Sequence, residues 1–263
     1  MEGFLQKKGI VMQGDITNHV SVVVPLSGGK DSQVCLMLAL KEYPADEIIA
    51  LFCDTGFEHP ITYAHIEKIT KQYGINLITL QAGTVLEKCL KYKRFPGGGA
   101  RHCTEELKII PSKYFYKLLA EQQGGLESWY GVRSEESKER EKRYRFKTTT
   151  ELYAPHDFMN KYPKYLENLG VMFRLPVLDW SKSEIFEYLQ GEENPLYTSG
   201  FDRVGCFPCL ASGDAWQMMA FHYGEVGRKH FRIAEQIAEV AGRPVLTTKK
   251  YMNQGPGCAL CCI

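Results

Sequence analysis

The chain has 263 residues, of which 44% are hydrophobic and 24% charged, and this balance excludes a disordered or fibrous protein. Its 32 basic and 31 acidic side chains give a net charge of +1, so attraction to nucleic acid has to come from local basic patches. Nine cysteines, an odd number, argue against a disulfide framework and, with no apolar run long enough to cross a membrane, favour a cytoplasmic protein that uses cysteine for metal or thiol chemistry.

Strands and helices alternate along most of the sequence. Apolar runs predict strands at residues 20–25, 48–53, 75–80, 126–132 and 171–178, and helical spacing predicts helices at 31–43 and 60–73. Ser181 and Glu184 have the spacing of a capping box, which predicts a helix through Leu189. This alternation is typical of an α/β fold with a parallel sheet covered by helices on both faces.

Three further segments lie outside this alternation. Residues 1–18 are a polar lead-in without a predicted element, and residues 96–99 are a glycine-rich loop of the kind that moves over a site. After Gly213 the spacing predicts two helices, at 215–223 and 228–241, followed by a tail. We therefore expect a nucleotide-binding α/β domain over residues 1–210 and a small helical C-terminal region with a cysteine-rich tail over 211–263.

A glycine-rich loop directly follows the first predicted strand, with the sequence Ser27-Gly-Gly-Lys-Asp-Ser32. Paired glycines let successive N–H groups point at one anion, the serine hydroxyls add donors, and the next helix presents its positive end. The spacing of the Walker motif is absent. The loop therefore predicts a site for a pyrophosphate group.

The loop resembles the PP-loop of the ATP-pyrophosphatase superfamily, and residues 54–60 resemble the second-strand motif of its PAPS reductase branch. Residues 131–137 with Arg140, and Asn194-Pro-Leu-Tyr197 leading into residues 205–209, agree with that branch. The resemblance implies a parallel-sheet fold like that of the adenine nucleotide alpha hydrolases. It also implies that the loop holds the β and γ phosphates of ATP, with Mg²⁺, or the phosphosulfate of an adenylyl sulfate.

Three residues are predicted to be catalytic. Lys30 is expected to contact phosphate, and Arg133, at the end of a later strand, to grip a phosphate with its planar guanidinium. Asp31 is the third, although a carboxylate also suits the first turn of a helix without catalysis. Glu136 and Arg140, four residues apart, suit either an ordering role in the site or a solvated salt bridge. The full nucleotide-binding set comprises Ser27, Gly28, Gly29, Lys30, Asp31, Ser32, Asp54, Thr55, Gly131, Arg133, Glu136 and Arg140.

Three cysteines are candidate metal ligands. Cys206 and Cys209 form a Cys-x-x-Cys pair in a turn flanked by glycine and proline, and two thiolates at that spacing can bind one metal. Cys103 precedes a predicted helix that Thr104 would cap, near Arg101 and Lys108, and such positive surroundings favour the thiolate. The apolar surroundings of Cys35, Cys53 and Cys89 predict core residues.

In iron–sulfur members of the resembled branch, a cysteine before a helix and a later Cys-x-x-Cys hold a [4Fe-4S] cluster, which implies ligation by Cys103, Cys206 and Cys209. The APS reductase type has adjacent cysteines where this chain has His102-Cys103. The fourth iron would then be open, bound by His102, or bound by the tail through Cys258 or Cys262. Zn²⁺ at the same cysteines is the alternative. For the tail, a disordered end is one interpretation, and a thiol relay or a fourth ligand is the other.

The stretch 138–147 contains six basic and two acidic residues, with Tyr144 and Phe146 between them. Basic groups neutralise phosphates and aromatic faces stack on bases, so this stretch predicts a nucleic-acid track. A solvated helix face or a lid over substrate phosphates is the alternative.

These features favour an ATP pyrophosphatase that forms AMP and pyrophosphate and activates a nucleic-acid oxygen for sulfur incorporation. The combination resembles the ATP-pyrophosphatase component of DNA phosphorothioation systems, with a cysteine desulfurase as the sulfur donor. A tRNA thiolation enzyme and a PAPS or APS reductase forming sulfite are the alternatives, although the tail sequence Gly257-Cys-Ala259 departs from the Glu-Cys-Gly motif of the reductases. A cluster-bearing or nucleotide-sensing subunit without activity is a third class.

Overall fold

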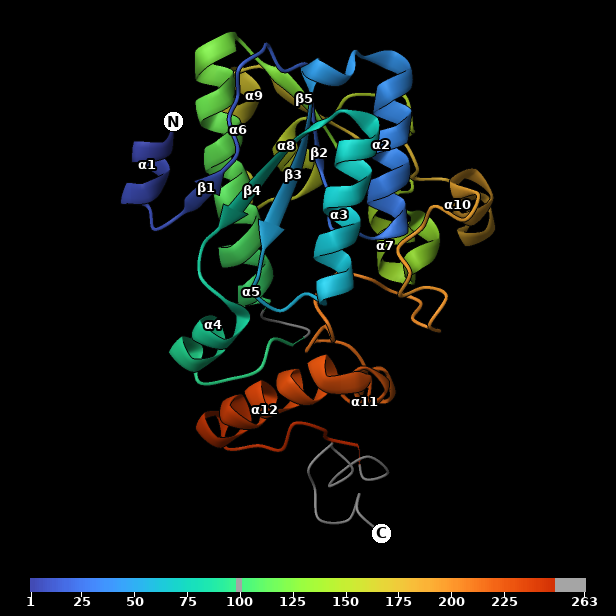
Figure 1. Ribbon diagram of the computed structural model, residues 1–263. Helices are drawn as coiled ribbons and strands as arrows, with labels where there is room; N and C mark the ends of the chain where they lie inside the picture. Colours follow the sequence, from blue (N-terminus) through green and yellow to red (C-terminus); the bar gives the residue numbers. More distant parts are fainter. Residues whose placement is uncertain (98–100, 249–263) are drawn as a thin grey trace.

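The computed structural model describes residues 1–97 and 101–248, and a six-stranded sheet forms its centre (Figure 1). The strand order is β1-β4-β3-β2-β5-β6, with β1 antiparallel to β4 and all other neighbours parallel. This arrangement confirms the predicted α/β class with a mostly parallel sheet. The strands are β1 (Val11–Gln13), β2 (Val22–Pro25), β3 (Ile48–Asp54), β4 (Asn76–Gln81), β5 (Leu126–Trp129) and β6 (Val171–Arg174).

Helices cover both faces of the sheet, because alternate strand residues point to opposite sides. Val22 and Val24 pack with α2 (Lys30–Glu42), α3 (Pro60–Tyr73) and α10 (Lys182–Leu189), whereas Val23 packs with the other side. The helices of that other side are α1 (Glu2–Lys7), α6 (Ile110–Gln123), α8 (Pro155–Phe158) and α9 (Tyr165–Asn168). The strands are therefore apolar on both faces, as buried parallel strands are.

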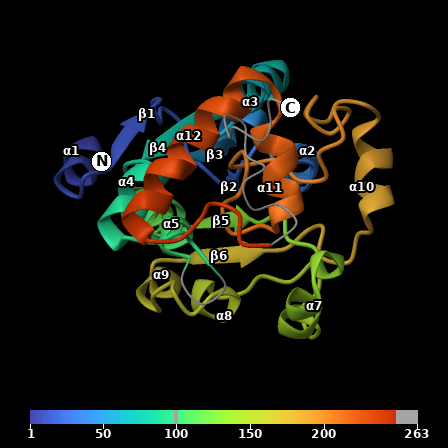
Figure 2. The same cartoon turned by 90° about the horizontal axis from the view of Figure 1, so that it is seen from below.

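The remaining helices lie mainly around the carboxyl ends of the strands, where Figure 1 and Figure 2 place α11 and α12 beneath the sheet. A third apolar core joins Phe57 and Leu107 to Phe221 and Phe231, so the C-terminal helices pack on the loops of this edge. These elements are α4 (Val85–Tyr92), α5 (His102–Thr104), the π-helix η2 (Glu105–Ile109), the 3₁₀ turn η3 (Ser134–Glu136), α7 (Lys138–Tyr144), α11 (Asp214–Phe221) and α12 (Gly224–Ala241); a further 3₁₀ turn, η1 (Ala45–Glu47), precedes β3.

Most predicted elements are present within a few residues of their predicted ends. The helix predicted at 60–73 has those bounds, with His59 Nδ1 accepting a hydrogen bond from the Ile61 amide and Gly74 ending the helix at φ +67°. The capping box of Ser181 and Glu184 is also present.

Two sequence predictions about elements are wrong. The polar lead-in forms α1 and β1. Thr104 makes no side-chain cap, because the helical segment already begins at His102 and continues through η2. The predicted boundary at Leu210 stays a prediction; Leu210 itself packs in the third core, and the loop at 98–100 and the tail beyond 248 lie outside the described residues.

Candidate nucleotide-binding site

The glycine-rich loop connects the end of β2 to the first turn of the 13-residue helix α2. It is closed by its own serines: Ser32 Oγ donates to the Gly29 carbonyl at 2.9 Å, and the Ser27 amide donates to Ser32 Oγ at 3.3 Å. Gly28 has φ +73°, and a Cβ there would lie 2.6 Å from the Thr62 methyl group. The loop thus turns tightly against α3 and presents the N-terminus of α2, the geometry that binds phosphate.

Residues from distant parts of the sequence brace this loop. The buried Asn194 side chain donates to the Gly28 carbonyl at 3.2 Å, and the Lys30 amide donates to the Tyr197 hydroxyl at 3.0 Å. The sequence indicated Asn194-Pro-Leu-Tyr197 only through the resemblance. In the structure this segment holds the glycine-rich loop by two hydrogen bonds. It fixes the position of the loop from the side of α10.

Gln33 and His65 form a second brace, between the first turn of α2 and the middle of α3. His65 Nε2 lies 2.9 Å from Gln33 Oε1, so the neutral ring donates from Nε2, and the Gln33 amide donates to the Glu192 carbonyl. Burial lowers the pKa of His65 to about 4, and the charge of Lys68 acts in the same direction. The folded protein therefore holds His65 neutral at physiological pH.

This brace predicts a loss of stability in mild acid. Because the unfolded chain binds a proton near pH 6.5 and the folded chain near pH 4, stability falls as pH is lowered through that window, by about 3 kcal/mol in total. Urea unfolding at several pH values measures it. His65→Gln keeps an amide donor without titrating, so its stability should change less between pH 7 and pH 4; equal pH dependence of both proteins would contradict the assignment.

Lys30, Asp31 and Arg133 come together in one ion network. Lys30 Nζ lies 3.0 Å from one Asp31 oxygen and Arg133 Nε lies 2.5 Å from the other, while Arg133 Nη1 lies 2.6 Å from Glu135. Lys30 and Arg133 are almost fully buried. Burial lowers the pKa of Lys30, and the charge of Asp31 opposes that shift. The three predicted catalytic residues thus anchor the start of α2, and their phosphate contacts stay a prediction.

Asp54 and Thr55 end β3 and organise the neighbouring turn. Asp54 accepts hydrogen bonds from the Tyr63 hydroxyl, at 2.7 Å, and from the Gly56 amide. Thr55 is fully buried, and both its hydroxyl, at 2.7 Å, and its amide donate to Glu58. Their oxygens are therefore engaged within the protein, and Glu58 is a buried carboxylate that the sequence prediction missed.

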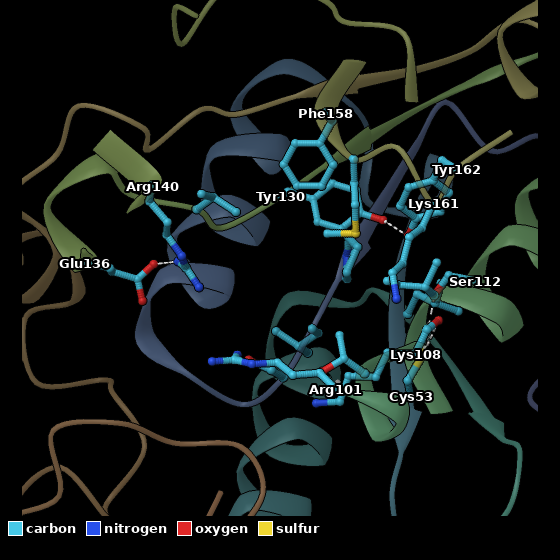
Figure 3. Close-up of a pocket in the computed structure, with 18 of the residues that line it drawn as sticks. Cys53, Arg101, Lys108, Ser112, Tyr130, Glu136, Arg140, Phe158, Lys161 and Tyr162 are labelled. Carbon is cyan, nitrogen blue, oxygen red and sulfur yellow. Dashed lines mark hydrogen bonds and ion pairs between the residues drawn. The ribbon is translucent and has the colours of Figure 1, made fainter. Parts of the chain in front are cut away.

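A cavity of about 750 Å³ opens beside the loop at the carboxyl ends of β2, β3 and β5. Three predicted nucleotide-binding residues line it, Ser27, Glu136 and Arg140, and the last two form an ion pair (Figure 3). The other nine predicted residues do not line it. Open α/β sheets bind ligands at this edge, so the cavity is the candidate nucleotide site.

Positive charge dominates the cavity wall. Three carboxylates face six cationic side chains, most of which the sequence left without a specific role in the site. Figure 3 shows Arg101 and Lys108 along one side and Lys161 across from Arg140. The excess of positive charge suits polyanionic ligands. The cations are Arg101, Lys108, Arg140, Arg143, Lys161 and Arg203.

The candidate ligand cysteines lie around Lys108. Cys206 raises the pKa of Lys108, with smaller contributions from Glu58 and Cys209. Burial raises the pKa of Cys206 to about 12, and Cys206 Sγ lies 3.4 Å from the Thr55 hydroxyl. The backbone bridge between Glu58 and Cys206 holds the Cys-x-x-Cys turn against the loop after β3.

The expected thiolate at Cys103 is not what the structure shows. Cys103 lies inside α5, and burial raises its pKa, although Lys108 opposes the shift. Cys35 and Cys89 are buried core residues as predicted, whereas Cys53 also lines the cavity and lies 3.4 Å from Ser112 Oγ. A thiol near the cavity was therefore missed at Cys53.

The predicted metal ligands lie partly within the described residues, 1–97 and 101–248. Within these ranges, no group of three or more His, Cys, Asp or Glu side chains is placed to hold a metal ion. Cys103, Cys206 and Cys209 do not form such a group within these ranges, and Cys258 and Cys262 lie outside the described residues. His102 is buried, with its Nε2 3.5 Å from Cys89 Sγ. The ligand set stays a prediction, and no chemical step is assigned to a metal.

One protein-family model matches most of this chain. The model of the phosphoadenosine phosphosulfate reductase domain matches residues 21–212, which contain the loop, the cavity and the Cys-x-x-Cys turn. The chain belongs to this family. The match confirms the resemblance to the PAPS reductase-like branch of the PP-loop superfamily. Within the described residues, no helix is long and apolar enough to span a membrane.

Two relatives and one solved structure are similar to the chain. An uncharacterised protein of Methanocaldococcus jannaschii is 36% identical over 193 residues, covering 72% of this chain but 36% of the relative, so this chain spans well under half of it. A phosphoadenosine 5'-phosphosulfate reductase of Photorhabdus laumondii is 28% identical, covering 70% and 68% of the two chains. The solved structure of a U34-tRNA thiolase of Methanococcus maripaludis with its [4Fe-4S] cluster has a TM-score of 0.45 and 17% identity, covering 89% and 76%.

Proposed function

We propose that this protein binds MgATP in the cavity and cleaves the bond between the α and β phosphates. The AMP moiety would pass to an oxygen of a nucleic acid with release of pyrophosphate, and a sulfur nucleophile would then displace AMP from the activated position. The proposal rests above all on one observation: Ser27 of the braced glycine-rich loop and six cationic side chains line one cavity. Mg²⁺ neutralises part of the triphosphate charge, which leaves cations for a second anionic substrate.

Different residues would hold the leaving pyrophosphate and the substrate phosphates in this reaction. The N-terminus of α2 and the hydroxyl of Ser27 would hold the leaving pyrophosphate, because fixed donors stabilise developing charge without reorganising. The ion network of Asp31 keeps the helix end in place. Lys108 and Arg101 would neutralise the substrate phosphates on the opposite side of the cavity. A cysteine desulfurase would supply the sulfur, and DNA is the preferred acceptor, with tRNA as the alternative.

Reduction of an adenylyl sulfate to sulfite is the second candidate, and the family match favours it. The same loop would hold the phosphosulfate, and a thiol would attack its sulfur. Cys53 lines the cavity and Cys206 lies behind Lys108, so thiols are near the predicted phosphate positions. This candidate differs from the first in its substrate and in the product that appears.

The product formed from ATP separates the two candidates. Anaerobically purified protein incubated with α-labelled ATP, Mg²⁺ and single-stranded DNA or tRNA should release labelled AMP and pyrophosphate. Lys108→Met should lower the rate at least tenfold, since it removes a cation from the cavity, whereas Lys7→Met, at an exposed position of α1 outside the cavity lining, should leave it unchanged. Sulfite formed from adenylyl sulfate with a thiol donor, without AMP release from ATP, would establish the reductase instead.

A further inference from the structure

One part of the cavity lining consists of aromatic rings. Tyr130, Tyr144, Phe158 and Tyr162 line it, and the rings of Tyr144 and Phe158 are parallel within 13°, with centroids 5.6 Å apart. The hydroxyls of Tyr130 and Tyr162 are 2.7 Å apart and hold these two rings together (Figure 3). The wall is therefore rigid, since its rings are fixed before any ligand binds.

Phe173 of β6 supports this wall from below. Its ring packs edge-on against those of Phe158 and Tyr162, with centroids 5.6 Å and 5.0 Å away, and it is tilted against Tyr130 at 4.8 Å. Phe173 is fully buried. The aromatic end therefore belongs to the sheet core and keeps its shape, which offers a fixed wall against which a flat ligand can lie.

Two cationic side chains of the cavity lining, Arg143 and Lys161, form exposed ion pairs. Arg143 of α7 pairs with Glu139 at 2.7 Å, and Lys161 pairs with Glu105. All four side chains of these pairs are well exposed, with 42% to 79% of their area accessible. Exposed ion pairs contribute little to stability, so a phosphate group can replace the carboxylates at small cost.

A further aromatic residue, Phe146, lies outside the cavity lining, two positions after Tyr144. Phe146 is 82% exposed, the most exposed of the large apolar side chains described, and the Arg145 guanidinium lies 4.3 Å from its ring centre. Next to it, Lys147 Nζ lies 3.8 Å from the ring centre of Tyr153. The exposed ring of Phe146 does not contribute to the core. It suits stacking on a nucleobase, and the neighbouring cations can neutralise the phosphates of the same strand.

We propose that these residues form an acceptor face that binds single-stranded nucleic acid, defined by Arg143, Tyr144, Arg145, Phe146 and Phe158. One unpaired nucleobase would enter the aromatic end of the cavity, and a neighbouring base would stack on Phe146. An unpaired strand is required because the faces of paired bases are covered by their neighbours in the helix. This inference rests on the proposed function, and it specifies that the acceptor is single-stranded.

The binding strand would run past the loop end of the cavity. Because Arg140 and Arg143 lie on the same short helix and both line the cavity, a backbone following α7 would bring one phosphate toward the predicted position of the ATP phosphates. Arg101 and Lys161 reach the cavity from two other segments. The acceptor oxygen and the nucleotide would then share one cavity, as transfer between them requires.

Fluorescence anisotropy tests the acceptor face with labelled oligonucleotides of one sequence, as single-stranded DNA, single-stranded RNA and duplex DNA, over a salt series. Single strands should bind more tightly than duplex. Phe146→Ala should weaken single-strand binding about tenfold. Arg143→Ala should reduce the slope of log affinity against log salt concentration by about 1. Preference between the DNA and RNA arms identifies the acceptor.

Two matched variants serve as controls. Val240→Ala removes an exposed apolar side chain on α12, and Lys7→Ala removes an exposed cation of α1 that does not line the cavity. Both should bind single strands as the parent protein does. Duplex binding as tight as single-strand binding, or an unchanged affinity of Phe146→Ala, would overturn the inference.

ATP binding in the same variants keeps the two proposals apart. Phe146→Ala should bind ATP normally in the absence of nucleic acid, since Phe146 lies outside the cavity lining. Selective single-strand binding without AMP release would contradict the proposed function and leave the acceptor face standing. AMP release stimulated equally by single strands in the parent and in Phe146→Ala would contradict the acceptor face alone.

Discussion

Arg133→Met should destabilise the protein by about 3 to 5 kcal/mol, because removal of one partner leaves buried charge without compensation. The Arg133 guanidinium binds Asp31 and Glu135 and also donates to the Trp180 carbonyl at 3.3 Å. It is 3% exposed, so water cannot replace these contacts. Urea unfolding at neutral pH, without nucleotide, measures the change.

Arg133→Lys is the matched control for this experiment. Lysine keeps the positive charge but lacks the planar fork that binds two carboxylates at once, so its loss of stability should be smaller but clear. The sequence predicted that Arg133 grips a phosphate, and an arginine used for that contact alone would leave the stability of the nucleotide-free protein unchanged and lower nucleotide affinity instead. Such a result would contradict the ion network.

Gly131→Ala should displace the first turn of α2 from the side of β5. A Cβ on Gly131 would lie 2.7 Å from both the Asp31 carbonyl carbon and the Ser32 nitrogen, which are backbone atoms of the first turn of α2. They cannot move aside without shifting the loop. We expect a loss of about 3 kcal/mol in stability and, from misplaced phosphate donors, about a 100-fold fall in catalytic efficiency with ATP.

Gly3→Ala provides the comparison, because Gly3 is exposed in α1 and a Cβ there meets nothing within 4 Å. It should leave stability and nucleotide affinity essentially unchanged. Calorimetric titration with a non-hydrolysable ATP analogue and urea unfolding of both variants check the prediction. Unchanged nucleotide affinity in Gly131→Ala would show that the phosphates lie elsewhere.

Local patterns predicted the parts of this fold that depend on neighbours in sequence. The apolar runs at β2 and β3, the capping box at Ser181 and the glycine-rich loop each contain their signal within a few residues, and the structure has them all. Strand β1 carries no such signal. Its three residues form a strand because Met12 pairs with Leu80 of β4, which no local pattern reveals.

The site was less predictable for the same reason. The loop sequence identifies an anion site, but the partners of Arg133 and the brace from Asn194 depend on contacts between residues far apart in the chain. The charge run at 138–147 predicted basic character and not which side chains face the cavity. Arg143 lines it, whereas Lys142 does not, because a helix turns neighbouring residues to different sides.

The edges of the sheet bear on how this molecule avoids aggregating. An open sheet exposes unpaired backbone groups at both ends, and long flat edges recruit strands from other molecules. Here one edge strand, β1, has only three residues, and at the other edge Tyr153 bridges to Phe173 of β6. Both edges are thus poor templates for strand addition, so the protein can keep a positively charged cavity at the carboxyl ends of its strands without joining its neighbours edge to edge.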